Sequence, residues 1–161
     1  MPRSTGENIV SKKYVVMGLQ RVSHNLYKKN IPILPRAVFL FTRLLCGCSI
    51  PPAVEIGEGT RLAHNGLGVV IHDKCVIGRN TVIQANVVLG GKSGEGGPRI
   101  GDYCYIGAGA VILGEINIGN DVIVGANAVV THDVPPGSVV VGIPAKVVKR
   151  VDANMIGMEK K

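Results

Sequence analysis

The sequence has few aromatic residues and contains no tryptophan. Phenylalanine and tyrosine together make up 4% of its 161 residues. A core built around large rings is therefore excluded, and we expect an aliphatic one. Single-stranded nucleic-acid sites interleave basic residues with aromatic rings, so nucleic acid is a poor candidate partner despite a net charge of +7. A membrane surface or a phosphorylated small molecule remains as an anionic partner.

Metal-binding cysteine patterns and export signals are also missing. The four cysteines, Cys46, Cys48, Cys75 and Cys104, have neither metal-ligand nor disulfide-framework spacing. Cys75 and Cys104 lie within the repeat described next, and we expect both to be small core or wall residues. The N-terminus has no signal-peptide pattern. We therefore expect a reducing, cytoplasmic location.

A six-residue repeat runs from about Ile50 to Val140. An isoleucine, leucine or valine opens each hexad, and glycine often follows it at once. The fourteen opening residues are Ile50, Ile56, Leu62, Ile71, Ile77, Ile83, Leu89, Ile100, Ile106, Ile112, Ile118, Val124, Val130 and Val140. A period of 3.6 would spread them around a helix, and a period of 2 would not set glycine beside each one. A short fixed period instead indicates a solenoid.

Six residues suffice for one short strand and one tight corner. Three hexads would form a triangular coil of about 18 residues with the aliphatic side chains inside, and the repeat would make roughly five coils. We expect the glycine that follows, or an Asn or Asp, to take the corner, where positive φ is often required. The inner row alone is too small to offset the entropy of ordering the chain, so packing between subunits of a homo-oligomer is expected.

Two helices are predicted before the repeat. Apolar residues at helical spacing between Lys12 and Lys29 predict the first, and Arg36 to Cys46 reads as a second, very apolar one. The second is too short to span a bilayer. We expect it to cap the solenoid or pack between subunits, with peripheral membrane contact as the less favoured alternative. The predicted organisation is a helical segment at 1–48, a solenoid at 49–148 and a C-terminal tail at 149–161.

Two insertions interrupt the period between Ile56 and Ile118. Leu62 to Ile71 spans nine residues and contains A-H-N-G-L-G, and Leu89 to Ile100 spans eleven and contains G-G-K-S-G-E-G-G-P-R. Insertions in a repeat protein become loops on one face, often the functional one. A glycine-rich loop also lets a backbone approach a ligand closely. The alternative for both is a tolerated surface insertion.

Several stretches of the repeat resemble serine O-acetyltransferases and related O-acetyltransferases of polysaccharide assembly. They are L-A-H-N-G-L-G-V-V-I-H-D-K-C-V-I-G, V-V-L-G-G, I-G-A-G-A-V-I-L-G-E-I, V-G-A-N-A-V-V and V-P-P-G-S-V-V-V-G-I-P-A-K-V-V. The resemblance implies a left-handed parallel β-helix of hexapeptide repeats and a homotrimer with active sites between neighbouring subunits. It also implies transfer of acetyl from acetyl-CoA to a hydroxyl group.

The resemblance assigns a catalytic residue as well. His64 matches the family's catalytic histidine, and a side chain with an ordinary pKa of about 6.5 suits removal of a proton from an acceptor hydroxyl. Asp73 falls near a family glutamate and is a candidate to orient or polarise His64, with a plain solvated carboxylate as the alternative. His72 is a further candidate for a supporting role.

A cofactor groove is implied in the same way. Gly91, Ala108 and Ala126 match positions along which the family lays the pantetheine arm of acetyl-CoA, in a groove that only small residues leave open. Lys146 matches a basic residue near the CoA phosphates. Because the walls of such a solenoid favour small residues anyway, these positions indicate a groove only together with His64.

Three residues depart from the family's pattern, one at the partner of the catalytic histidine and two at the acceptor site. Ser49 stands in place of the aspartate that partners the histidine, Ala63 in place of the aspartate before it, and Gly97 in place of a second histidine. The last two help to bind serine in the family, so we expect a sugar hydroxyl of a surface polysaccharide or its precursor, with serine as the alternative. Two other classes share the fold, a metal-dependent lyase resembling γ-type carbonic anhydrase and a non-catalytic trimeric scaffold.

Overall fold

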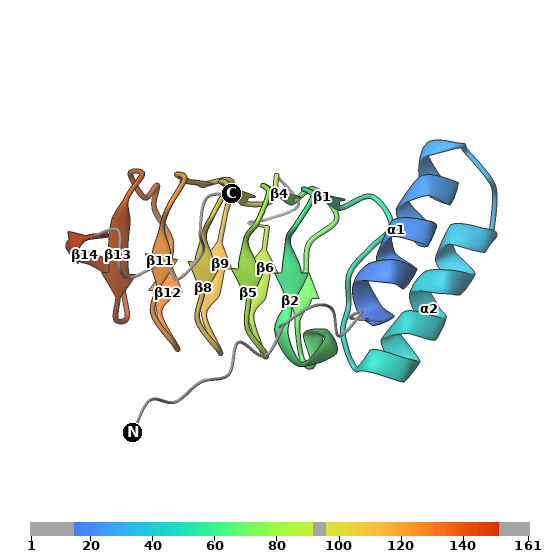
Figure 1. Cartoon of the computed structure of the whole chain (residues 1–161), viewed down its shortest axis with the longest axis horizontal. Coiled ribbons are helices and arrows are strands. Elements are labelled where there is room, and N and C mark those ends of the chain that lie inside the picture. The colour runs from blue at the N-terminus through green and yellow to red at the C-terminus, as the bar shows by residue number, and fades with distance from the viewer. Residues whose placement is uncertain (1–14, 92–95, 152–161) are drawn as a thin grey trace, which may run out of the picture.

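A computed structural model of the chain describes residues 15–91 and 96–151. Two helices are followed by a long stack of short strands (Figure 1). The elements are α1 Val15–Lys28, α2 Leu34–Cys46, β1 Glu55–Ile56, β2 Arg61–Leu62, the 3₁₀ turn η1 Ala63–Gly66, β3 Val70–Ile71, β4 Val76–Ile77, β5 Val82–Ile83, β6 Val88–Gly90, β7 Arg99–Ile100, β8 Tyr105–Ile106, β9 Val111–Leu113, β10 Asn117–Ile118, β11 Ile123–Val124, β12 Val129–Val130, β13 Ser138–Val141 and β14 Lys146–Arg150.

The strands form three sheets that run along the stack. They are the β1 sheet (β1-β4-β7-β10), the β2 sheet (β14-β13-β11-β8-β5-β2) and the β3 sheet (β12-β9-β6-β3). The pairing is parallel throughout, except that β14 runs antiparallel to β13 and ends the β2 sheet. From β1 to β13, consecutive strands belong to different sheets, so the chain turns a corner after each one. The predicted three-sided parallel β-helix is confirmed.

The register shows how the insertions are accommodated. Partners are 18 residues apart where the hexads are unbroken, as from Val70 to Val88. The first insertion widens the separation to 21 residues, from Glu55 to Val76, and the second widens it to 23, from Val76 to Arg99. The first insertion falls between β2 and β3 and the second between β6 and β7, and the strand pairing continues on both sides of each.

Thirteen of the fourteen predicted inward residues are buried, and Ile56 is half-buried. The structure also shows a second row of inward-facing residues, each two positions before a hexad aliphatic residue. The sequence did not reveal this row. Its buried members are Cys48, Val54, Thr60, Val69, Cys75, Thr81, Val87, Pro98, Cys104, Ala110, Val122, Ala128 and Ser138. Where this row is polar, it bridges coils: Thr81 Oγ1 donates to Gly101 O at 3.0 Å and accepts from Cys104 N at 3.1 Å. Cys75 and Cys104 are core residues, as predicted.

The corners differ from the sequence expectation. The glycine directly after a hexad residue does not have positive φ; instead, a Cβ added at Gly78 would lie 2.5 Å from the carbonyl carbon of Gly101 on the next coil. Positive φ occurs two residues later, as at Asn80, Asn86 and Asn127. The glycine therefore permits close stacking of coils, and a separate residue takes the left-handed conformation, for which Gly and Asn are suited.

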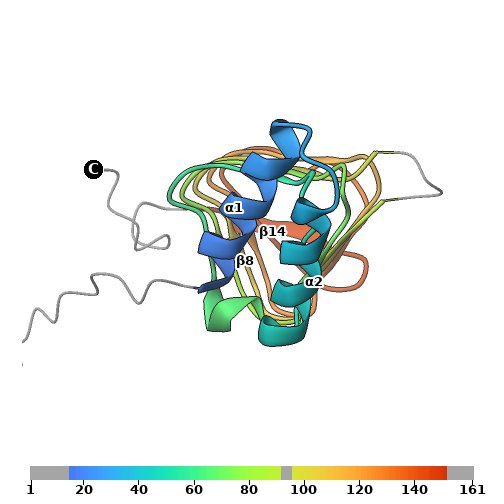
Figure 2. The same cartoon turned by 90° about the vertical axis from the view of Figure 1, so that its right-hand side faces the viewer.

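The two helices lie across one end of the solenoid (Figures 1 and 2). In α1, Val16 is fully buried and Gln20 Nε2 donates to Val54 O at 3.1 Å. His24 Nδ1 lies 2.8 Å from Pro52 O, so this half-buried histidine also contacts the solenoid. The solenoid end is therefore capped chiefly by α1, whereas the sequence analysis had assigned this role to the second helix.

The second helix packs mainly on the first. Ser23 Oγ of α1 donates to Pro35 O at 2.8 Å, at the beginning of α2. The helix begins at Leu34, two residues before the predicted start, because Pro35 is well suited to a first helical turn. It ends at Gly47, which is left-handed and donates its N–H to Arg43 O. Neither of these helices is long and apolar enough to cross a bilayer.

Candidate active site

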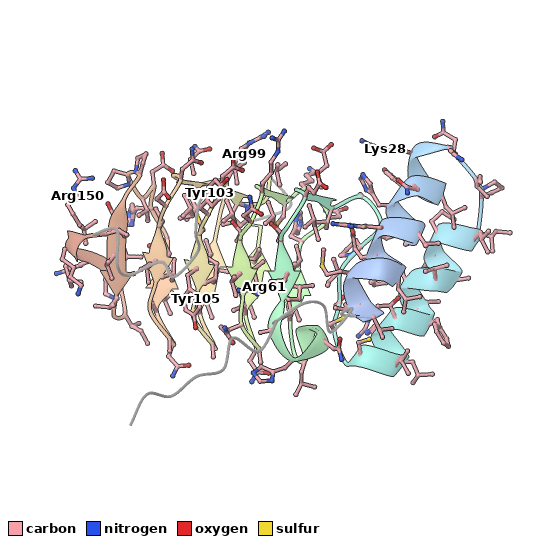
Figure 3. All side chains as sticks on the ribbon, viewed as in Figure 1. Lys28, Arg61, Arg99, Tyr103, Tyr105 and Arg150 are labelled. Carbon is pink, nitrogen blue, oxygen red and sulfur yellow. The ribbon has the colours of Figure 1, made fainter. Side chains whose placement is uncertain are left out.

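The β3 sheet has the most uniformly apolar outer face of the three. Its outward positions are Val70, Val88, Val111 and Val129, with Ser49 bridged to Val70 at the start of the row. The corresponding positions of the other sheets include charged and aromatic side chains such as Arg61, Arg99 and Tyr105, which point away from the solenoid (Figure 3). The predicted site residues all lie along the two edges of the β3 sheet.

The first of these edges is the corner between the β2 and β3 sheets, called here the His64 edge. His64 lies between β2 and β3, Ala108 between β8 and β9, and Ala126 between β11 and β12. Lys146 opens β14 opposite Val141, after a turn in which Gly142 O accepts from Val129 N at 3.0 Å. The structure thus brings four of the six predicted residues to one edge, spaced along the length of the solenoid.

The second edge is the corner between the β3 and β1 sheets, called here the Asp73 edge. Asp73 follows β3, and Gly91 follows β6. No contact joins Asp73 to His64 among the described residues, because the β3 strand separates them. Asp73 therefore cannot be read as the orienting partner of His64 within one chain, and Gly91 does not share an edge with the other predicted cofactor residues.

His64 occupies a constrained backbone. His64 and Asn65 both have left-handed conformations, with φ of 53° and 54°. The loop is pinned because Gly66 is buried beside Val16 of α1 and Gly68 N donates to Gly47 O at 2.9 Å. Two consecutive left-handed residues other than glycine are uncommon, and such strain concentrates at functional sites. The His64 side chain is exposed, and no described residue hydrogen-bonds to its ring.

The Asp73 edge contains a histidine–carboxylate pair. His72 Nδ1 lies 3.2 Å from Asp73 Oδ1 and 3.3 Å from Lys74 N. Because one ring nitrogen cannot donate to Asp73 and accept from Lys74 N together, the tautomer selects one of the two contacts. Asp73 thus partners His72, the histidine that the sequence favoured less than His64.

An open groove of about 500 Å³ lies at the Asp73 edge. It is lined by Pro51, Val70, Ile71, His72, Asp73, Val88, Leu89 and Gly90. Sequence reasoning did not find this groove, although V-V-I-H-D and V-V-L-G-G, which supply seven of these residues, both belong to stretches that carried the resemblance. The groove joins the apolar β3 face to a polar corner, an arrangement that suits an organic ligand.

The three buried cysteines, Cys48, Cys75 and Cys104, are structural. Burial raises the pKa of the Cys75 thiol to about 12 and those of Cys48 and Cys104 to about 11. A buried thiol that stays protonated is a poor nucleophile and a poor metal ligand. Within residues 15–91 and 96–151, no group of three or more His, Cys, Asp or Glu side chains could hold a metal ion.

The comparisons with known proteins agree with this fold. Residues 97–132 match the family model described as bacterial transferase hexapeptide (six repeats). The chain is a hexapeptide-repeat protein that resembles serine acetyltransferases. It is 41% identical to the serine acetyltransferase of Synechococcus elongatus over 133 residues (81% of this chain, 54% of the relative), and 45% identical to that of Staphylococcus xylosus over 139 residues (84% and 63%).

Solved structures give the same likeness. The Neisseria gonorrhoeae serine acetyltransferase aligns with a TM-score of 0.81 at 39% identity, covering 85% of this chain and 54% of the other. The Brucella abortus enzyme in complex with coenzyme A aligns with a TM-score of 0.81 at 30% identity, covering 84% and 55%. This hexapeptide-repeat chain spans between half and two thirds of the length of these relatives.

Proposed function

We propose that the chain is an acetyl-CoA-dependent O-acetyltransferase in which His64 is the general base. The observation that carries the proposal is the His64 edge, where an exposed histidine on a strained loop is aligned with Ala108, Ala126 and Lys146. The likeness to serine acetyltransferases, one of them in complex with coenzyme A, supports the same reaction.

The residues of this edge fit the donor. Ala108 and Ala126 are exposed and leave the wall open, and a Cβ at the adjacent Gly107 would lie 2.6 Å from Ala126 N. The two coils therefore stack as closely as glycine allows along this edge of the solenoid. Lys146 is exposed at the end of the row, where its ammonium group can meet the phosphates of CoA.

The chemistry requires one proton to be moved twice. His64 takes the proton of the acceptor hydroxyl as the oxygen attacks the thioester carbonyl of acetyl-CoA. The tetrahedral adduct then expels the CoA thiolate, which takes the proton from the His64 imidazolium. The products are the acetyl ester and free CoA, and His64 is neutral again.

The acceptor to test first is serine. The sugar acceptor expected from the sequence has no support in the comparisons, since the relatives named above are serine acetyltransferases. Ala63 and Gly97 still favour a sugar as the second candidate, because both replace residues that bind serine in the family. At Gly97 a Cβ would lie 2.8 Å from Cys75 Sγ, so a histidine cannot be restored there without moving the wall.

A homotrimer accounts for the division of residues between two edges. The valine row of the β3 sheet is suited to face another copy, because it is apolar and Val70 is 46% exposed in the single chain. Packing of this kind would set the Asp73 edge of one subunit beside the His64 edge of the next. Asp73, His72 and Gly91 would then complete the site across the interface.

The decisive experiment measures free thiol released from acetyl-CoA by the purified chain, with serine and a panel of sugars and nucleotide sugars. His64→Ala should lower turnover by roughly 10²–10⁴-fold with CoA affinity almost unchanged. His132→Ala is the matched control, since His132 is an exposed corner histidine whose Nδ1 lies 3.0 Å from Thr131 Oγ1. Equal activity of the His64→Ala variant would remove His64 from the mechanism. CoA binding without turnover would favour the scaffold, and loss of CoA binding would reject the groove.

A further inference from the structure

The helix α2 presents its larger apolar side chains outward. It buries Pro35 and Thr42, whereas Leu44 is 87% exposed. The exposed apolar residues of the helix are Leu34, Ala37, Leu40, Phe41, Leu44 and Leu45. At 100° per residue they form one arc of roughly 140°, and Ile33, just before the helix, is 83% exposed. A helix that turns such an arc away from its own protein has a partner surface.

The charge around this arc has one sign. From residue 8 to residue 54 the sequence contains no aspartate or glutamate. The described part of this segment carries five exposed basic side chains, at Arg21, Lys28, Lys29, Arg36 and Arg43. Arg36 and Arg43 lie beside each other at one border of the apolar arc by the same helical arithmetic. Lys28 lies at the far end of α1, next to the turn into α2 (Figure 3).

These two observations select the occupant. A second copy of the cap would bring like charges together around the apolar arc, without any carboxylate in the segment to offset them. An anionic bilayer offers phosphate groups to the basic border and hydrocarbon to the apolar arc, and a helix with this pattern is suited to lie in the plane of the interface. The cap also lies at one extreme of the molecule, where a flat surface can reach it (Figure 1).

We propose that the helical cap docks on the surface of an anionic lipid bilayer. The outward side of α2, with Ile33, enters the interface, and Lys28, Lys29, Arg36 and Arg43 lie against the lipid phosphates. The proposal does not depend on the acetyl-transfer reaction. The His64 loop packs on α1 through Gly66, so docking of the cap would place this loop in the coil nearest the membrane.

The test is flotation of the full chain with phosphatidylcholine vesicles, with and without phosphatidylglycerol. We expect flotation only with phosphatidylglycerol, weakening as salt is raised. Leu44→Glu and Phe41→Glu should each weaken binding about tenfold or more. Val148→Glu is the matched control, because Val148 is 56% exposed, like Phe41 at 57%, but lies in β14 at the opposite end. An unchanged thermal midpoint would show that the variants fold.

The outcomes separate the possible occupants. Flotation lost in Leu44→Glu, retained in Val148→Glu and reduced in the double variant Arg36→Gln, Arg43→Gln supports docking on anionic lipid. Absence of flotation with either vesicle overturns the proposal, and equal binding to neutral vesicles overturns the role of charge. Self-association that Leu44→Glu abolishes, without vesicle binding, would assign the arc to a second copy and overturn the proposal as well.

Discussion

The solenoid and the helical cap are both rich in aliphatic residues, but they place these residues on opposite sides. In the solenoid, each hexad side chain is covered by the coils before and after it, and residues such as Ile83 and Ile106 are completely buried. In the cap, α2 packs mainly on α1, and Leu40, Leu44 and Leu45 remain exposed. Neighbouring coils of a repeat therefore bury each other's apolar side chains, whereas a single outer helix can bury its apolar side chains only against a partner outside the chain.

The largest effect should come from the solenoid interior. Ile106→Ala removes a fully buried side chain in the middle of the stack. Because the neighbouring coils are held by their backbone ladders, the cavity cannot collapse, and the free energy of unfolding should fall by about 2–5 kcal/mol. Urea denaturation followed by circular dichroism measures this change. A loss below about 1 kcal/mol would mean that the coils relax far more than close packing allows.

A pair of glycine substitutions sharpens the contrast. Gly78→Ala places a Cβ 2.5 Å from the next coil and should destabilise the protein by about 1–3 kcal/mol. Gly18 is an exposed residue of α1, and nothing lies within 4 Å of a Cβ added there. Gly18→Ala should therefore stabilise the protein by about 0.5–1 kcal/mol. Both free energies come from the same denaturation experiment. The same sign for the two variants would contradict the assignment of the hexad glycine to coil stacking.

The buried thiols predict a smaller, pH-dependent effect. In the unfolded chain a thiol loses its proton near its ordinary pKa of about 9, whereas burial raises the pKa of Cys104 to about 11. Between these values the folded state binds more protons, so the free energy of unfolding should fall as pH rises, by up to about 1.4 kcal/mol per pH unit for each thiol. Below about pH 8 the thiol is protonated in both states, so it should no longer make the free energy of unfolding depend on pH. Cys104→Ala should lessen the slope between pH 9 and 11, and an unchanged slope would contradict the inference.

Most of the fold could be predicted from the sequence because the repeat is local. One aliphatic residue in every six, with glycine beside it, fixes strand, corner and coil together. The second inward row escaped prediction because Thr81, Cys104 and Ala128 share no residue type, only a position. The corner was misassigned for a related reason: the glycine that often follows the aliphatic residue allows close approach of the next coil, a contact between residues distant in sequence.

The site could be predicted only in part. His64, Ala108, Ala126 and Lys146 fall on one edge because their spacing follows the coil, which the repeat already defined. The position of Asp73 on the other edge, beside His72, depends on how many residues the first insertion adds at its corner. The groove at that edge could not be foreseen, since it is formed by side chains from two coils and from Pro51.

The smallest effect on stability should come from the cap, where a substitution tests whether its apolar residues are exposed in solution. Leu44→Ala removes as much side chain as a core substitution, but Leu44 is 87% exposed and loses almost no contact in the single chain. The free energy of unfolding should therefore change by less than about 0.5 kcal/mol. Denaturation at two protein concentrations checks this value. If Leu44→Ala instead lowered the free energy of unfolding almost as much as Ile106→Ala, and more so at higher protein concentration, a second copy of the chain would cover Leu44 in solution. The apolar residues of the cap would then be buried between copies, as those of the solenoid are buried between coils.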